Sequence, residues 1–203
     1  MGASAVRQAQ PADGPRAAAL RIARSNDDFE GILALQRANL RQALSPGEQA
    51  AGGFVFLQHD LAVLRRMAAK LPQAIALADG RVVGYCLALA VGLRHEVPDL
   101  EPMFVQFERC RHRGRALSSW RYFVGGQVCV DREFRGQRLA ARLYREICGS
   151  LPAPYEVCVT EIAARNRASL SSHESMGFRR ILDYSDGQED WVICAWDLDG
   201  PGR

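Results

Sequence analysis

The chain has 203 residues, of which 48% are hydrophobic and 24% are charged. That length and apolar content allow one substantial core and favour a single globular domain over two. The 26 basic and 23 acidic residues leave a formal net charge of +3, which is too small to indicate a nucleic-acid-binding protein by itself.

The two ends of the chain predict no targeting or membrane segment. Residues 1–16 lack the apolar run of a secretory signal, and Val6 stands where a myristoylation sequon requires Ser or Thr. We expect residues 1–16 to be a disordered tail, residues 17–199 a single domain and residues 200–203 a short C-terminal tail. No apolar run approaches the roughly 20 residues of a membrane span, so we expect a soluble protein without a membrane partner.

Six cysteines are spread along the chain without C-x-x-C spacing, and most of them fall within apolar runs. A thiol in such a run acts as a small hydrophobic side chain, which favours a reducing, cytoplasmic location. Cys110 and His112 form a C-x-H pair, but a structural zinc site needs two further ligands at motif spacing. We therefore predict no metal site.

The N-terminal third predicts a strand followed by two helices. The apolar residues 19–23 predict a short strand, and Ser25 with Asp28 three residues later predicts the capped start of a helix. Gly and Pro punctuate residues 44–54, which indicates a loop. A second amphipathic helix is expected to begin at Asp60.

The middle of the chain predicts a hairpin and then a long irregular segment. Asp79-Gly80 separates two apolar runs in residues 74–90, which is a strong signal for a β-hairpin turn. Between Val91 and Trp120 the periodicity fails, which predicts a loop, and a loop this long usually has a function. This segment carries a basic cluster that is more typical of a solvated surface than of a site for an acidic substrate, namely Arg109, Arg111, Arg113 and Arg115.

The last third of the chain alternates strands and helices. The periodicity predicts a strand at 122–130, a helix from Leu139 onward, a strand at 155–163, a short helix within 166–178 and a final hairpin at 180–197. The complete order of elements is therefore β-α-α-β-β-β-α-β-α-β-β.

The turn after the strand at 122–130 carries three arginines and a glycine, within the run VCVDREFRGQRLAARLY (128–144). A helix that begins directly after a tight turn leaves N–H groups unpaired at the positive end of its dipole, and this geometry attracts phosphate. Gly136 allows a sharp turn, and Arg135 and Arg138 add positive charge for a diphosphate. The spacing matches neither a P-loop nor a dinucleotide-binding fingerprint.

This run resembles the acyl-CoA-binding signature of the GNAT acetyltransferase superfamily, in which Arg or Gln is followed by two residues, Gly, one residue, and Gly or Ala. Arg135 and Ala140 match its ends, whereas Arg138 stands at the central glycine. We expect Arg138 to donate its backbone N–H there with a helical φ angle, which needs no glycine. The run NRASLSSHESMGF (166–178) resembles a second family segment, in which an Asn contacts CoA and a helix ends in Gly-Phe. GQVCVD, VTEI and SLSSHESMGF are similar to an uncharacterised bacterial subgroup of the superfamily.

The resemblance covers roughly residues 18–198 and implies a mixed α/β, GNAT-like acyl-CoA acyltransferase fold. Its central sheet would be mixed but mostly antiparallel, with about seven strands flanked by about four helices. The cofactor it implies is acetyl-CoA. The implied contacts with CoA come from Val128, Cys129 and Val130 for the pantetheine arm, from Arg135, Gly136, Gln137, Arg138, Leu139 and Ala140 for the diphosphate, and from Asn166 and Ser169.

Two side chains are candidate proton carriers. His173 stands where the family often has a Tyr that protonates the sulfur, and an imidazole could donate that proton or act through water. The alternative for His173 is a surface or CoA-contacting residue without a chemical role. Glu161 lies on an apolar strand, where a carboxylate is paired, functional or at an edge. Because the family's fourth and fifth strands splay around the reacting centre, we favour Glu161 as the base, with a chain of bound water as the alternative.

The amine acceptor is expected between the first helices and the segment before residue 122. Phe54, Phe56, Trp120 and Tyr122 could wall its pocket, although each is also typical of a core. The resulting hypothesis is an N-acetyltransferase that moves the acetyl group of acetyl-CoA to a primary amine of a small molecule or protein, by direct attack in a ternary complex. The alternatives are a non-catalytic acyl-CoA sensor and, least favoured, a nucleic-acid binder. We predict no nucleic-acid partner and leave a homodimer open.

Overall fold

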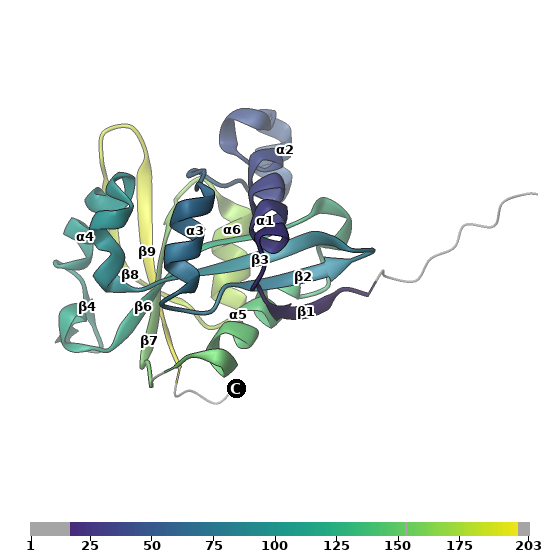
Figure 1. Ribbon diagram of the computed structural model, residues 1–203. Helices are drawn as coiled ribbons and strands as arrows, with labels where there is room; N and C mark the ends of the chain where they lie inside the picture. The colour runs from purple at the N-terminus through teal and green to yellow at the C-terminus, as the bar shows by residue number, and fades with distance from the viewer. Residues whose placement is uncertain (1–16, 153, 199–203) are drawn as a thin grey trace, which may run out of the picture.

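A seven-stranded sheet organises the chain, with α-helices on both of its faces (Figure 1). The computed structural model describes residues 17–152 and 154–198, so both predicted tails and the predicted boundary at residue 199 lie outside the described residues. Across the sheet the strands are ordered β1 (Ala19–Ile22), β2 (Ala74–Ala78), β3 (Arg81–Leu89), β6 (Tyr122–Val130), β7 (Val157–Ala163), β9 (Asp190–Asp197) and β8 (Arg179–Ser185). β6 and β7 pair in parallel, and the other neighbours pair antiparallel. The predicted fold class is confirmed.

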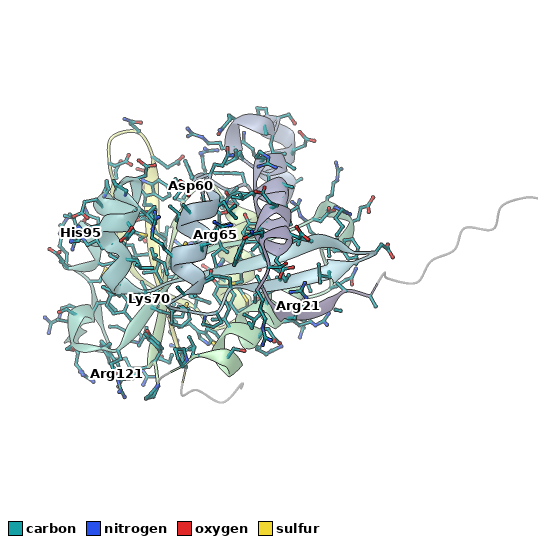
Figure 2. All side chains as sticks on the ribbon, viewed as in Figure 1. Arg21, Asp60, Arg65, Lys70, His95 and Arg121 are labelled. Carbon is teal, nitrogen blue, oxygen red and sulfur yellow. The ribbon has the colours of Figure 1, made fainter. Side chains whose placement is uncertain are left out.

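The sheet separates the hydrophobic core into two layers, and helices cover each layer. α1 (Asn26–Ala38), α3 (Leu61–Ala68) and α4 (Glu101–Phe107) pack on the face that is turned toward the viewer in Figure 1, where Ile32, Leu64 and Phe104 are buried. α5 (Leu139–Ser150) and α6 (Arg167–Ser175) pack on the opposite face. Arg65 points from α3 toward α1 (Figure 2), where its guanidinium donates to Asn26 Oδ1 at 2.8 Å.

Local turn and cap chemistry places several elements where the sequence predicts them. Ser25 and Asp28 form a reciprocal capping box at the start of α1, and Asp28 also accepts two hydrogen bonds from the guanidinium of Arg21. In the hairpin between β2 and β3, Asp79 and Gly80 both have positive φ angles, of 51° and 74°. Such a pair of angles matches the right-handed twist of the two strands.

The loop predicted at residues 44–54 is wrong, because most of it is the short helix α2 (Pro46–Gly52). Ser45 and Glu48 form a second capping box, and Pro46 occupies a first-turn position, where its missing N–H costs nothing. The proline and the glycines therefore mark the two ends of a helix rather than an irregular segment. Gly53 ends it with a φ of 73°.

The long loop predicted between Val91 and Trp120 is partly wrong. It contains α4 and a small hairpin formed by β4 (Arg111–His112) and β5 (Arg115–Ala116). α4 is two turns long, which is too short to show helical periodicity. The arginines of the basic cluster mostly hold this insertion in place: Arg113 pairs with Asp197 at 2.9 Å, and the guanidinium of Arg115 lies 4.1 Å from the ring centroid of Trp120.

Candidate active site

The parallel ladder between β6 and β7 is short, and the two strands then separate. Tyr122, Phe123 and Val124 pair with Val157, Cys158 and Val159, and the ladder ends there although both strands continue. One residue further along, Thr160 Oγ1 donates to the carbonyl of Gly125 at 2.9 Å. Beyond this contact lies a gap inside the sheet, as the resemblance to the family implies.

Backbone groups of β6 line this gap. β6 carries an extra residue opposite the Leu87–Ala88 step of β3, as a β-bulge does, so its pairing with β3 is offset around Gly126. The carbonyl of Val130 accepts from Arg135 Nε at 3.0 Å, whereas the N–H of Asp131 donates to Val83 of β3. Because backbone groups alternate between the two sides of a strand, the N–H and C=O of Val128 point to the side from which β7 has separated.

A cavity of about 800 Å³ adjoins the gap, between β6, α5, α6 and the segment that follows α2. This size lies within the roughly 300–1,000 Å³ typical of ligand pockets. The structure brings most of the predicted site residues together along its wall: Phe54, Val128, Cys129, Val130, Arg135, Gly136, Arg138, Leu139, Ala140, Asn166, Ser169 and His173. Gln137, Glu161, Trp120 and Tyr122 lie outside this wall.

The turn before α5 has two residues in the left-handed region. Gly136 has a φ of 77° and Arg138, at the N-cap of α5, has a φ of 54°. The expected helical φ at Arg138 is therefore wrong, and the reason why a glycine suits this position is conformational. No side chain caps α5, so the first N–H groups of this helix are available to an anion at the cavity wall.

The side chain of Arg135, which the sequence predicts to add charge for a diphosphate, is held by protein groups in this structure. Its guanidinium donates to the carbonyl of Val130 and, at 3.2 Å, to Asn39 Oδ1. It also covers Gly52, since a Cβ on that glycine would lie 1.7 Å from Arg135 Nη1. Arg135 thus fastens the end of α2 to the turn before α5.

Asn166 joins α6 to the segment that follows α2. Its Nδ2 donates to the carbonyl of Phe54 at 3.0 Å, and its Oδ1 accepts from the N–H of Ser169 at the start of α6. A Cβ on Gly53 would lie 2.7 Å from the same Oδ1, so only glycine fits there. The side chain of Asn166 lines the cavity, but its hydrogen bonds serve the fold.

His173 is buried in the cavity wall and holds a tyrosine that sequence analysis did not single out. Its Nδ1 lies 2.8 Å from the carbonyl of Ser169, which can only accept, so Nδ1 carries the proton and Nε2 accepts from the hydroxyl of Tyr144 at 3.1 Å. Burial lowers the pKa of His173 to about 4, so the ring is neutral at neutral pH. Both nitrogens are engaged, and the ring in this arrangement offers no proton to a ligand.

Tyr144 reaches from α5 to the point where β6 and β7 separate. A Cβ on Gly125 would lie 2.7 Å from its hydroxyl oxygen, so this glycine makes room for the phenol. Two signals were available in the sequence: a buried tyrosine requires a polar partner, and Gly125-Gly126 interrupts an otherwise apolar strand.

Glu161 lies on the other face of the sheet, directly after Thr160. It shares that face with Val159, as strand alternation predicts, because successive side chains point to opposite sides. The hydroxyl of Tyr184 donates to Glu161 Oε1 at 2.6 Å. Burial raises the pKa of Glu161 to about 7, although the hydrogen bond from Tyr184 lowers it in part. The two faces of the separation point thus carry different groups, Tyr144 with His173 on one and Glu161 with Tyr184 on the other.

A buried polar cluster on the Glu161 face was also missed by sequence analysis. Gln127 of β6 accepts from Tyr85 at 2.5 Å and from Gln36 at 2.6 Å, and it donates to the carbonyl of Leu57 at 2.9 Å. Gln36 also bonds to Nδ1 and to the backbone N–H of His59. The cluster fixes residues 57–59 against β6. Asn166 at the start of α6 holds the carbonyl of Phe54, so residues 54–57 connect α6 on one face of the sheet to the Gln127 cluster on the other.

The four aromatic residues predicted for an acceptor pocket do not come together. Phe54 lines the large cavity and contacts Phe56, with ring centroids 5.3 Å apart. Trp120 and Tyr122 line a different hollow of about 450 Å³, together with Val91 and Tyr155. Phe56, in turn, packs on Trp191 of β9 with ring centroids 4.8 Å apart.

The described part of the chain shows no metal-ligand cluster, disulfide or membrane-spanning helix. Residues 17–152 and 154–198 contain no group of three or more His, Cys, Asp or Glu side chains arranged to hold a metal ion. All six cysteines are free thiols. Within the same ranges, no helix is both long enough and apolar enough to cross a membrane.

Comparison with solved structures identifies the architecture. No protein-family model and no curated protein sequence matched the chain. The ribosomal-protein-S18-alanine N-acetyltransferase from Escherichia coli is 12% identical, with a TM-score of 0.58 over 92% of this chain and 97% of that chain. An N-acetyltransferase from Staphylococcus aureus Mu50 is 17% identical, with a TM-score of 0.58 over 90% of this chain and 99% of that chain.

A third structure is a GNAT superfamily phosphinothricin acetyltransferase from Sinorhizobium meliloti in complex with acetyl-CoA. It is 19% identical, with a TM-score of 0.57 over 89% of this chain and 88% of that chain. At these identities the comparisons show the fold. The chain has the GNAT acetyltransferase fold that the two sequence runs predicted.

The left-handed Arg138 predicts a stabilising substitution. We expect Arg138→Gly to raise the free energy of unfolding by about 0.5–1 kcal/mol. Glycine relieves the strain of a positive φ, but it also increases the conformational entropy of the unfolded chain, which offsets part of this stabilisation. Denaturant unfolding measures this difference. Arg138→Ala is the matched control, since it removes the guanidinium but keeps the Cβ. An equal gain in Arg138→Ala would mean that charge repulsion, not backbone strain, is relieved.

Proposed function

We propose that the chain is an N-acetyltransferase of the GNAT superfamily, which transfers an acetyl group from acetyl-CoA to a primary amine of a small molecule or protein. The observation that carries this proposal is the separation of β6 and β7 directly beside a cavity at the start of α5. A thioester arm lying along β6 would pass through the sheet at this point and reach the face of Glu161.

The charge of the cavity supports a polyanionic ligand. The charged residues on its wall are Arg113, Arg135, Arg138, Arg145 and Arg179 against Asp197 alone. CoA has a diphosphate and a further phosphate, and the N–H groups at the start of α5 suit the diphosphate. The free backbone groups of Val128 suit the amides of a pantetheine arm. The residues present therefore fit acetyl-CoA, which would supply the acetyl group as an activated thioester.

The proton transfers of the reaction suit a carboxyl group whose pKa lies near neutral pH. In a ternary complex the amine nitrogen forms a bond to the carbonyl carbon, and the bond from that carbon to sulfur breaks with its electron pair on sulfur. The nitrogen loses one proton and the sulfur gains one. Glu161 needs only to accept the proton from nitrogen and return it through water, for which a pKa of about 7 is favourable.

A second candidate function is an acyl-CoA sensor without turnover. Two observations favour it: the strained Arg138 at the glycine position, and the engagement of His173 with Tyr144 instead of with a ligand. Both functions require the same cofactor site, so binding alone does not separate them.

Calorimetry with CoA and acetyl-CoA, followed by an assay of thiol release over a panel of amines, tests the proposal. We expect binding of both compounds and amine-dependent release of free thiol from acetyl-CoA. Binding without release for any amine would favour the sensor. Absence of binding would contradict both functions.

Glu161 should control the pH dependence of the rate. Because its carboxyl ionises with a pKa of about 7, kcat/KM should rise as pH rises through about 7. Glu161→Gln should lower the rate by roughly 100-fold above this pH and abolish the rise. Tyr184→Phe is the matched variant: it removes a hydrogen bond that lowers this pKa, so the midpoint should move to higher pH with the rise retained. An unchanged pH profile in Glu161→Gln would remove Glu161 from the mechanism.

A further inference from the structure

The arginines on the cavity wall differ in whether they already have partners. Arg113 pairs with Asp197, and Arg135 donates to Val130 and Asn39. Within residues 17–152 and 154–198, the guanidinium groups of Arg138, Arg145 and Arg179 take part in no hydrogen bond or ion pair. Unpaired arginines that line a cavity are available to an anionic ligand.

Arg145 occupies a specific place relative to the turn before α5. It follows the N-cap Arg138 by seven residues, which is about two helical turns or 10 Å along α5. Residues seven apart lie on nearly the same side of a helix, and the small Ala141 lies between them on the cavity wall. The guanidinium of Arg145 therefore belongs to a residue two helical turns further along α5 than the N–H groups that suit a diphosphate.

The space between α5 and α6 suits a bulky group. α6 presents mostly small side chains to the cavity, including Ala168, Ser172 and Ser175. On the α5 side, Ala140 and Ala141 are equally small. Such walls leave room for a nucleoside between the helices, with Arg145 at its border.

We propose that Arg145 binds the 3′-phosphate of CoA and gives this chain a preference for CoA over 3′-dephospho-CoA. This inference rests on the proposed function, because it assumes that CoA occupies the cavity with its diphosphate at the start of α5. In CoA the 3′-phosphate is separated from the diphosphate by the ribose. From its position on α5, the long side chain of Arg145 can extend toward the start of the helix, and so toward a 3′-phosphate that lies one ribose away from the diphosphate. A guanidinium binds a phosphate with two parallel N–H donors, which gives both affinity and orientation.

The test compares the affinities of CoA and 3′-dephospho-CoA by calorimetry in wild type and variants. We expect wild type to bind CoA roughly tenfold more tightly, as a solvent-accessible charge-assisted contact allows. Arg145→Gln should reduce this ratio to about two or less, and Arg145→Lys should restore part of it. Arg142→Gln is the matched control: Arg142 is exposed on the same helix, donates to the carbonyl of Ala18 and lies outside the cavity wall, so the ratio should stay at the wild-type value.

The outcomes separate this inference from the function on which it rests. Equal affinities in wild type, or an unchanged ratio in Arg145→Gln, would overturn the role of Arg145 and leave the acetyltransferase proposal standing. Failure of both compounds to bind would overturn the proposed function and this inference together.

Discussion

The hydrogen bond from Thr160 to the carbonyl of Gly125 marks the point on which the site depends. On one side of it, β6 and β7 are neighbouring parallel strands of a continuous sheet, with Val124 paired to Val159. On the other side they separate, and unpaired backbone groups of β6 face a gap. Backbone N–H and C=O groups in the interior of a sheet need hydrogen-bond partners, and a ligand lying along β6 would supply them.

Contacts on both faces of the sheet and at the end of α2 stabilise this separation. Tyr144 and His173 pack behind it on the α5 and α6 face, where Gly125 leaves room for the phenol. On the opposite face, Gln127 joins β6 to the carbonyl of Leu57. Arg135 joins the end of α2 to the turn before α5. Asn166 joins the segment that follows α2 to the start of α6. A cavity of about 800 Å³ lies on the α5 and α6 face, whereas Glu161 lies on the other face and accepts from Tyr184.

The sequence predicts those parts of the fold that short-range chemistry determines. The hairpin at Asp79-Gly80 and the capping box of Ser25 and Asp28 need only neighbouring residues, and both are confirmed. The error at α2 arose because Pro46 and the glycines mark helix ends as well as loops, and the capping box of Ser45 and Glu48 distinguishes the two cases. The φ angle of Arg138 depends on how β6 is joined to α5. The sequence predicts this φ angle only if the central glycine of the family signature is taken to be there for its backbone conformation.

Contacts between distant residues could not be read from the sequence. The partner of His173 is Tyr144, 29 residues earlier, and the imidazole accepts a hydrogen bond from it, whereas one of the two roles considered for His173 was that of a proton donor. Phe54 and Trp120 were grouped because both are aromatic, yet they line different hollows. Strand alternation is local and puts Glu161 on the same face as Val159, whereas the burial that raises the pKa of Glu161 comes from packing between elements.

A crystal structure of the chain with bound acetyl-CoA tests the central claim most directly. We expect the diphosphate to contact the N–H groups of residues 136–140 and the thioester to lie in the gap beyond Gly125 and Thr160, open to the side of Glu161. A complex in which the diphosphate binds elsewhere, or in which β6 and β7 pair along their full length and leave no passage, would contradict it.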